Sequence, residues 1–196
     1  MAVLLLGAAA GLVVLLGLFW KFWFLRNPAR EIPPGRRLLS PADGRIIEIV
    51  PLEQPDTTGP EPGCAAGPPA AGYEITIFLS IFDVHYQRAP VEGRVESIRY
   101  IPGRFFPAFS PEASQNERNE VVLLHPELGR IRVTQVAGIL ARRIRCFVKR
   151  DDELSKGEIF GLIAFGSRVS MRIPRLDLKI RSGQRVKAGL TVLAEY

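Results

Sequence analysis

The sequence predicts a mainly β protein, in which a single β-sandwich or barrel-sandwich-hybrid-like domain follows one N-terminal transmembrane helix. Three observations predict this class. The 196-residue chain begins with an uncharged apolar run. After residue 38 it consists of short alternating or β-branched segments. Its 16 prolines and 18 glycines suit many turns. A hydrophobic content of 47% supports one packed core in a chain of this length.

The apolar run, "AVLLLGAAAGLVVLLGLFW", covers residues 2–20. At about 1.5 Å per residue, such a helix spans the hydrocarbon core of a bilayer. Trp20, Trp23 and Phe24 stand where an interfacial aromatic belt is expected. We therefore assign residues 1–24 to a transmembrane anchor. A cleaved signal peptide is the alternative, but here the charges follow the apolar run instead of preceding it.

Basic residues follow the anchor on one side. They are Lys21, Arg26, Arg30, Arg36 and Arg37. The positive-inside rule therefore predicts a cell-membrane protein whose C-terminal domain lies on the cytoplasmic face. Residues 25–37 include "NPAREIPPG". We expect an extended linker there, because its prolines oppose a helix and its charges oppose burial.

Residues 38–196 form the predicted β-rich domain, with about nine strands. The segments are 44–50, 73–80, 93–101, 119–125, 130–138, 143–148, 159–165, 168–174 and 190–196. Turn residues bound most of them. Between the first two strands, residues 51–72 hold six prolines and four glycines. That composition predicts a mobile surface loop.

Composition excludes some functional classes. The net charge of +6 suits nucleic acid, an anionic membrane or an acidic substrate. Basic residues interleaved with exposed aromatics are missing, however, so we expect no nucleic-acid partner. The two cysteines, Cys64 and Cys146, match no metal-ligand spacing, and only two histidines are present to supplement them. Free thiols in a reducing compartment are the expectation.

Four stretches carry polar residues of possible chemical use. They are "SPADGRI" (40–46), "IFDVHYQRAP" (81–90), "IPGRFFPAFSPEASQNERNE" (101–120) and "FGSRV" (165–169). Each alone has an ordinary explanation as a turn, a strand end, a loop over the core or a bulge. In this order, however, they resemble the phosphatidylserine decarboxylases, particularly the short-chain members. The resemblance covers roughly residues 36–196.

The resemblance implies self-cleavage at the Gly166-Ser167 bond, giving a large chain of residues 1–166 and a small chain of residues 167–196. Ser167 would become a covalent pyruvoyl group, which then serves as the electron sink for decarboxylation. No metal is implied. Glycine before the serine permits the backbone geometry in which the hydroxyl reaches the carbonyl that precedes it.

The resemblance also implies an Asp and a His beside the serine. Asp43 matches the aspartate, and His85 matches the first histidine of a D-x-H-x-x-H-x-P pattern. Arg88 stands at the second histidine position, and Arg168 stands where many relatives have threonine. His85 then serves both cleavage and later proton transfer, or Arg88 holds a carboxylate while another group moves protons. His125, beside a proline, is expected to be a surface residue.

The implied reaction converts phosphatidylserine in the membrane to phosphatidylethanolamine and CO₂. Phe105 and Phe106, with Phe109, suit either a lipid-facing lip or core packing. Arg104 and Arg118 have guanidinium groups that match a lipid phosphate or carboxylate. The expected partners are the lipid, the two chains of one precursor, and further copies in a homo-oligomer.

Two alternatives remain open. The segments "GRVESIRYIPG" and "IRSGQRVKAGLTVLAEY" also resemble biotinyl and lipoyl-type domains, as in membrane-anchored adaptors. Such a carrier needs a lysine in a Met-Lys turn, whereas this chain has Met171-Arg172. The other alternative is a decarboxylase homologue that is no longer processed.

Overall fold

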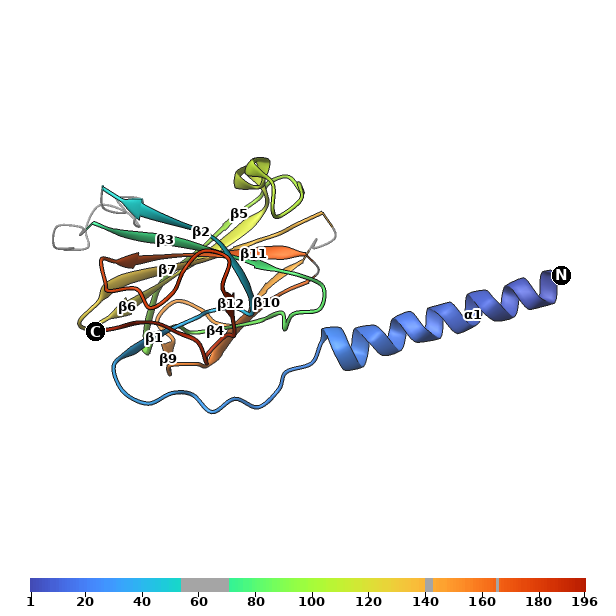
Figure 1. The fold of residues 1–196 in the computed structure, drawn as a ribbon, viewed down its shortest axis with the longest axis horizontal. Coiled ribbons are helices and arrows are strands. Elements are labelled where there is room, and N and C mark those ends of the chain that lie inside the picture. The colour runs from blue at the N-terminus through green and yellow to red at the C-terminus, as the bar shows by residue number, and fades with distance from the viewer. Residues whose placement is uncertain (54–70, 140–142, 165) are drawn as a thin grey trace.

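A computed structural model of the chain describes residues 1–53, 71–139, 143–164 and 166–196. Most of the predicted loop 51–72, with Cys64, lies outside the described residues. The fold is mainly β with one N-terminal helix, so the predicted fold class is confirmed. The helix projects from the β domain, and the C-terminus lies on the far side of that domain (Figure 1).

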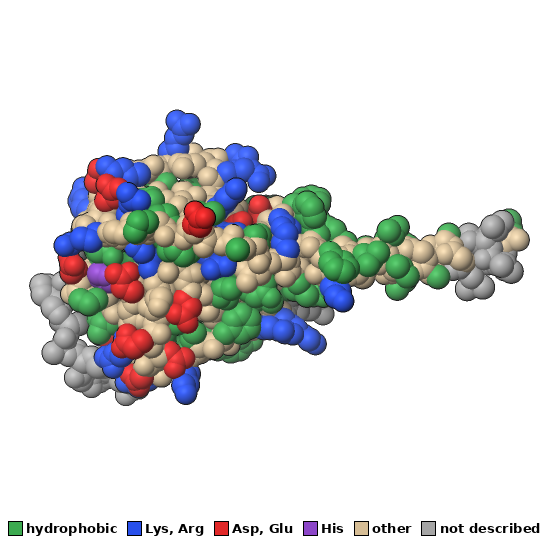
Figure 2. Space-filling view, turned by 90° about the horizontal axis from the view of Figure 1, so that it is seen from below, with side chains coloured by type: hydrophobic (Ala, Val, Ile, Leu, Met, Phe, Trp, Pro, Cys, Tyr) green, Lys and Arg blue, Asp and Glu red, His purple; other side chains and the backbone are tan. Residues whose placement is uncertain are grey.

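The N-terminal helix consists of α1 (Ala2–Leu18) and a π-helical end, η1 (Phe19–Phe24). Its window Gly7–Phe24 has a mean hydropathy of 1.7, so by length and composition this helix can cross a membrane. Apolar side chains gather where the helix meets the globular domain, and Lys and Arg side chains surround them (Figure 2). Trp20 and Trp23 are partly exposed, as a belt requires, but Phe24 is fully buried. The belt prediction is therefore wrong for Phe24, which packs on the β domain.

The main sheet has eight antiparallel strands. They are β2 (Gly44–Leu52), β3 (Gly72–Leu79), β5 (Gly93–Ile101), β6 (Arg118–His125), β7 (Gly129–Val136), β9 (Glu153–Leu154), β11 (Ser167–Pro174) and β12 (Arg185–Val186). Their order is β12-β2-β3-β11-β7-β6-β5-β9. Strand β11 is thus central, paired with β3 on one side and β7 on the other.

Two smaller sheets complete the domain. One contains β4 (Tyr86–Arg88), β10 (Ile159–Ile163) and β8 (Ile144–Cys146), and the other contains β1 (Arg37–Leu39) and β13 (Val192–Glu195). A short 3-10 helix, η2 (Pro111–Gln115), precedes β6. All nine predicted strands are present. The four that were not predicted, β1, β4, β9 and β12, have only two or three residues each, too few for alternation to be visible.

The core lies between the sheets. Ile75, Ile77, Val133, Val169 and Met171 of the central strands are all fully buried. Each large apolar side chain buried in this way stabilises the fold by about 1.5–3 kcal/mol. This core fixes the ends of β3, β10 and β11, which carry the residues of interest.

Candidate functional site

Two short connections bring His85 and Ser167 into one region. Ser167 begins β11 and pairs with Leu79, the last residue of β3. His85 precedes β4, and its carbonyl accepts a hydrogen bond of 3.2 Å from the Ile163 amide at the end of β10. Strands β3 and β11 belong to one sheet and β4 and β10 to another, so His85 and Ser167 each lie where the chain has passed between the same pair of sheets.

Asp43 joins this region from the start of β2. The next residues, Gly44 and Arg45, lie against Phe78, since Arg45 pairs with it. Gly44 has φ +146°, and a Cβ there would lie 2.1 Å from the Phe78 carbonyl oxygen. Glycine is therefore required for β2 to pass this close to β3 immediately after Asp43.

The Gly166-Ser167 bond occupies a tight backbone position. Gly166 has φ +56°, which favours glycine. A Cβ on Gly138 would lie 1.9 Å from the Gly166 carbonyl oxygen, so the two glycine backbones are in direct contact. Ser167 is fully buried, and its Oγ has no hydrogen-bond partner among the described residues. An unpaired hydroxyl therefore lies beside a carbonyl in a glycine-specific conformation.

His85 is also buried. Its exposed fraction is 0%, and neither ring nitrogen makes a well-aligned hydrogen bond within the described part of the chain, although the Asp83 backbone lies close enough to favour the protonated ring. Burial lowers the pKa of His85 to about 4; Arg26 acts in the same direction, and Asp83 and Asp43 oppose it. The imidazole is therefore neutral at neutral pH and has a free lone pair to accept a proton.

Asp83 shapes the turn that leads to His85. Its Oδ2 accepts hydrogen bonds from the Ser80 amide and hydroxyl, at 2.8 Å and 2.7 Å. This local turn closes the connection after β3. The motif aspartate thus fixes the backbone on which His85 stands.

Asp43 is held by a residue of the predicted linker. Arg30 Nη1 and Nη2 donate to Asp43 Oδ1 and Oδ2 at 2.6 Å and 2.9 Å, and the Ala188 amide donates to Oδ1 at 2.8 Å. The Arg30 side chain is only 4% exposed. We expected the charges of segment 25–37 to stay in solvent; a bidentate partner is what allows this guanidinium to be buried.

Arg88 contacts no carboxylate within hydrogen-bond distance among the described residues. Its Nη1 donates to the Gly157 carbonyl and its Nη2 to Asn27 Oδ1, both at 2.9 Å. These contacts involve no protein carboxylate, and the alternative in which Arg88 holds a carboxylate stays a prediction. Instead, this arginine fastens the segment that follows the N-terminal helix.

A chain of hydrogen-bonded, buried amide side chains contacts the backbone carbonyl of His85. Gln87 Nε2 donates to the His85 carbonyl at 2.7 Å, and Gln87 Oε1 accepts from Gln135 Nε2 at 2.9 Å. Gln135 Oε1 in turn accepts from Asn119 Nδ2 at 3.0 Å. This chain connects β4, β7 and β6, and it was not predicted. Polar amides at inward positions of apolar strands are the sequence signal that points to it.

The aromatic loop before β6 is fixed by Asn116. This fully buried side chain bonds both backbone groups of Phe106 and donates to the Ala137 carbonyl at 2.8 Å. Ala137 precedes Gly138, which contacts Gly166. The loop is thereby attached to the backbone beside the Gly166-Ser167 bond.

The predicted substrate residues of this loop differ in exposure. Phe105 and Phe106 are half-buried, whereas Phe109 is 71% exposed and makes an edge contact with Phe78. Arg104 is exposed and lies over the Phe106 ring. Arg118 contacts Glu120 and the Ser114 carbonyl. The loop therefore presents one aromatic ring and one guanidinium to solvent, and its other rings pack inward in part.

His125 lies in a different environment. We expected a surface residue, but it is only 3% exposed. Its Nδ1 accepts from the amides of Glu127 and Leu128, both at 3.1 Å, and its Nε2 lies 3.2 Å from the Tyr196 hydroxyl. The surface prediction is wrong because the His125 ring closes a turn and packs against the C-terminus.

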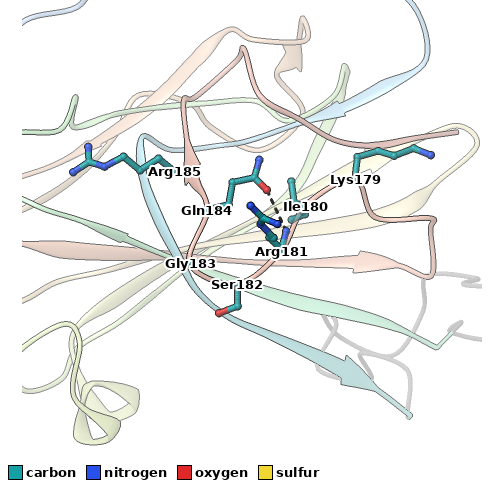
Figure 3. A pocket seen from close by; sticks show the side chains of 7 residues that line it. All are labelled: Lys179, Ile180, Arg181, Ser182, Gly183, Gln184 and Arg185. Atoms are coloured by element: carbon teal, nitrogen blue, oxygen red, sulfur yellow. Dashed lines mark hydrogen bonds between the residues drawn. The ribbon is translucent and has the colours of Figure 1, made fainter.

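A separate depression of about 770 Å³ is lined by Lys179, Ile180, Arg181, Ser182, Gly183, Gln184 and Arg185. It is built by the turn before β12, and Figure 3 shows Lys179 and Arg185 extending from it in opposite directions. None of the predicted site residues lines it. The depression is a surface feature, whereas Ser167 and His85 are enclosed.

Comparisons with known proteins agree with these motifs. The phosphatidylserine decarboxylase family model matches residues 19–194. A phosphatidylserine decarboxylase proenzyme of Carboxydothermus hydrogenoformans is 42% identical, over 93% of this chain and 83% of its own length. Proteins of the same name from Ralstonia nicotianae and Rhodopirellula baltica are 39% and 40% identical, over 98% and 89% of this chain and 87% and 70% of their own lengths. The chain therefore belongs to the phosphatidylserine decarboxylase family.

Proposed function

We propose that the chain is the precursor of a pyruvoyl-dependent phosphatidylserine decarboxylase that cleaves itself between Gly166 and Ser167. One observation carries this proposal. Ser167 Oγ is buried without a hydrogen-bond partner among the described residues. It follows Gly166, whose φ of +56° is a backbone conformation that favours glycine. Burying an unpaired hydroxyl costs free energy, so its retention at a family cleavage motif indicates a reactive role.

Self-cleavage begins with a proton transfer. Ser167 Oγ attacks the Gly166 carbonyl carbon while His85 accepts the hydroxyl proton. The C–N bond then breaks, the Ser167 nitrogen takes up a proton, and an ester joins the two chains. Removal of the Ser167 α-proton expels the Gly166 carboxylate, and hydrolysis of the resulting dehydroalanine releases ammonia. The Ser167 backbone thereby becomes the pyruvoyl group.

His85 and Asp43 have separate roles in this scheme. The neutral imidazole of His85 is ready to accept a proton, because burial has lowered its pKa to about 4. The negative charge of Asp43 stabilises the imidazolium that forms, since it acts to raise the His85 pKa. When the pyruvoyl group is present, its carbonyl supplies the electron sink for decarboxylation. His85 is then the group that returns a proton to the substrate carbon.

The small chain has the contacts needed to stay bound after cleavage. Residues 167–196 contribute β11, β12 and β13, which pair with β3 and β7, β2, and β1. Ser167, the expected new N-terminus, is in register with Leu79 in the uncut chain. Cleavage therefore opens one peptide bond without removing a strand from its sheet.

We also predict that the protein forms a homo-oligomer. Light scattering of the protein in detergent measures its oligomeric state.

The proposed substrate is phosphatidylserine in the bilayer, approached from the cytoplasmic face. A diacyl lipid leaves the membrane only at high cost, so the site must lie at the membrane surface. The apolar helix and the exposed Phe109 support this location. We assign Arg104 and Arg118 to the anionic lipid head group, with Phe105 and Phe106 lining its approach.

Intact-mass measurement of the purified protein tests this proposal. We expect a thirty-residue fragment, residues 167–196, with a blocked N-terminus that reacts with a carbonyl reagent. Ser167→Ala should leave one intact chain. Ser170→Ala is the matched control, because Ser170 is buried in the same strand but its hydroxyl bonds Thr76 at 3.2 Å; that variant should still be cut.

Activity is measured as CO₂ release from vesicles that contain carboxyl-labelled phosphatidylserine. We expect release by the cleaved protein and none by Ser167→Ala. An uncut wild-type chain would contradict the proposal and favour an unprocessed homologue. An uncut chain that is also acylated by biotin or lipoate would favour the adaptor alternative.

A further inference from the structure

The segment between the membrane helix and the β domain, residues 24–30, crosses the candidate site. We call this segment the strap. The ring of Phe24, its first residue, lies 4.0 Å from the His85 ring between centroids and is fully buried. Arg26 Nη2 donates to the Phe82 carbonyl at 2.6 Å. The strap therefore contacts the "FDVHYQR" segment at its histidine and at its first residue.

The strap is held at two further points. Asn27 Oδ1 accepts a hydrogen bond from Arg88, the residue at the second histidine position of the motif. Arg30 forms the bidentate pair with Asp43, and its Nη1 also donates to the Ala188 carbonyl. The side chains of this pair are 4% and 11% exposed. A flexible tether would not make several specific contacts with the domain or bury an ion pair, so the strap is part of the folded domain.

We infer that the strap is a positioning element of the self-cleavage site, in which Phe24 seals His85 from water and Arg30 fixes the Asp43 carboxylate. The inference rests on the proposed function. In this arrangement Arg30 acts through Asp43, and Phe24 acts through His85. Neither residue is assigned a contact with the scissile bond. This arrangement also explains why a guanidinium from the linker is buried in the domain.

Each contact has a chemical consequence. A bidentate arginine fixes the plane of a carboxylate, which a lysine ammonium does not do. Phe24 covers a histidine whose pKa depends on burial, and the charged groups that act on His85 are Asp83, Arg26 and Asp43. Removing the ring admits water and should return the His85 pKa toward 6.5.

The strap also sets the height of the site above the membrane. Phe24 is the last residue of the helical window that can span a bilayer, and it contacts His85 directly. The end of the anchor and the proposed base are therefore adjacent. This arrangement holds the reaction centre at the bilayer surface, where the head group of a lipid is reached without extraction of its acyl chains.

The first test compares two arginines of the same linker. The full chain is made by cell-free translation with phosphatidylglycerol vesicles, and release of the thirty-residue fragment is followed over time. Arg30→Lys should slow release by about tenfold or more, because the fork geometry is lost. Arg36→Gln is the control, since Arg36 makes an exposed pair with Glu127; its rate should stay within about twofold of wild type.

The second test compares two phenylalanines of the helix end. Phe24→Ala should lower the cleavage rate at pH 5 relative to pH 8 by about tenfold, because a rehydrated His85 is largely protonated at pH 5. Phe22→Ala is the control, because Phe22 is 67% exposed; its ratio should match wild type. A thermal unfolding midpoint for each variant shows whether the domain is folded.

The outcomes separate the inference from the function on which it rests. Wild-type cleavage with unchanged rates in folded Arg30→Lys, or an equal loss at both pH values in Phe24→Ala, would overturn the strap inference alone. A wild-type chain that is never cut would overturn the proposed function and the strap inference with it. Slower cleavage in Arg30→Lys together with the altered pH ratio in Phe24→Ala supports both roles.

Discussion

The two histidines of this chain lie in contrasting regions. His85 and His125 are 0% and 3% exposed, and burial lowers the pKa of both. Around His125 the polar atoms are paired: two backbone amides bond its Nδ1, and Tyr196 lies at its Nε2. By contrast, His85 Nδ1, His85 Nε2 and Ser167 Oγ make no well-aligned hydrogen bond among the described residues.

The contrast is the one expected between a structural histidine and the proposed reactive one. A buried polar group without a partner costs roughly 1–3 kcal/mol. The polar atoms of His125 are hydrogen-bonded, so this cost does not arise there. It does arise at the side-chain atoms of His85 and Ser167. Burial and pKa direction are the same for both residues, so neither property identifies the site. Hydrogen-bond pairing does separate the two histidines, and paired substitutions in the two regions test whether it also marks the proposed site.

The largest difference should appear when each histidine is replaced by glutamine. His85→Gln removes the proposed base, so we expect cleavage at Gly166 to slow by about 10²–10⁴-fold. His125→Gln should leave cleavage intact in the folded protein, while unfolding becomes easier because turn amides lose their acceptor. Fragment release and urea unfolding measure the two effects. Normal cleavage by His85→Gln would show that another group is the base.

The next difference concerns two glycines, one in each region. Gly138→Ala would place a Cβ 1.9 Å from the Gly166 carbonyl oxygen, so one of the two backbones must shift, and we expect the proposed scissile bond to be displaced. Misplacement of the scissile bond should slow cleavage by about 10²-fold. Gly129, in the His125 turn, has φ +68° and no atom within 4 Å of an added Cβ among the described residues. Gly129→Ala should therefore cost about 1–2 kcal/mol of stability through strain, with cleavage unchanged.

If Gly138→Ala cleaves at the normal rate while remaining folded, the close glycine contact is only a packing feature. The Gly129 variant controls for the general cost of adding a methyl group to a strand or turn. Comparison of the two rates thus separates local misplacement of the scissile bond from loss of stability.

Sequence patterns are sufficient for the strands that alternate over many residues. Strand β5 has the predicted bounds, and the resemblance of the four stretches to a known family singles out Asp43, His85 and Ser167. These features are local: period-two alternation follows from the pleat, and glycine before serine follows from backbone geometry. The proposed roles of these residues remain predictions that the experiments above test.

Features that depend on distant contacts are not predictable in this way. Arg30 is thirteen residues from Asp43, and the Ala188 amide is 145 residues away. Proline spacing and charge in the linker describe an extended chain, and they give no sign that one arginine is buried. The bond between Gln87 and Gln135 likewise joins β4 to the β6-β7 hairpin across 48 residues of sequence. Such contacts depend on the tertiary arrangement, which single-sequence patterns do not encode.

Stability against pH gives a third, smaller difference. The folded pKa of His85 is about 4 and its ordinary value is 6.5, so the unfolded state binds the proton first as pH falls. The contribution of His85 to the free energy of unfolding is therefore fully present above pH 6.5. It is lost progressively as the pH falls from 6.5 to about 4. The loss due to His85 is roughly 3 kcal/mol. Urea unfolding in a Ser167→Ala background, which keeps every chain uncut, measures it.

In that background, His85→Gln should lose much less stability between pH 6.5 and pH 4 than the chain with His85 intact. His125→Gln should remove a part of the same acid sensitivity, because burial lowers the pKa of His125 as well. Equal pH profiles with and without His85 would show that this imidazole is hydrated in solution, contrary to its burial against Phe24.

The smallest difference concerns two tyrosines. Tyr196→Phe removes the hydroxyl that lies 3.2 Å from His125 Nε2, and we expect a loss of about 1 kcal/mol in the free energy of unfolding. Tyr86 follows His85, and its hydroxyl has no hydrogen bond among the described residues. Tyr86→Phe should therefore change stability by less than about 0.5 kcal/mol. If the two variants lose equal stability, hydrogen-bond pairing does not separate the two regions. An unequal loss, in the expected order, attributes the difference to the paired polar atoms around His125.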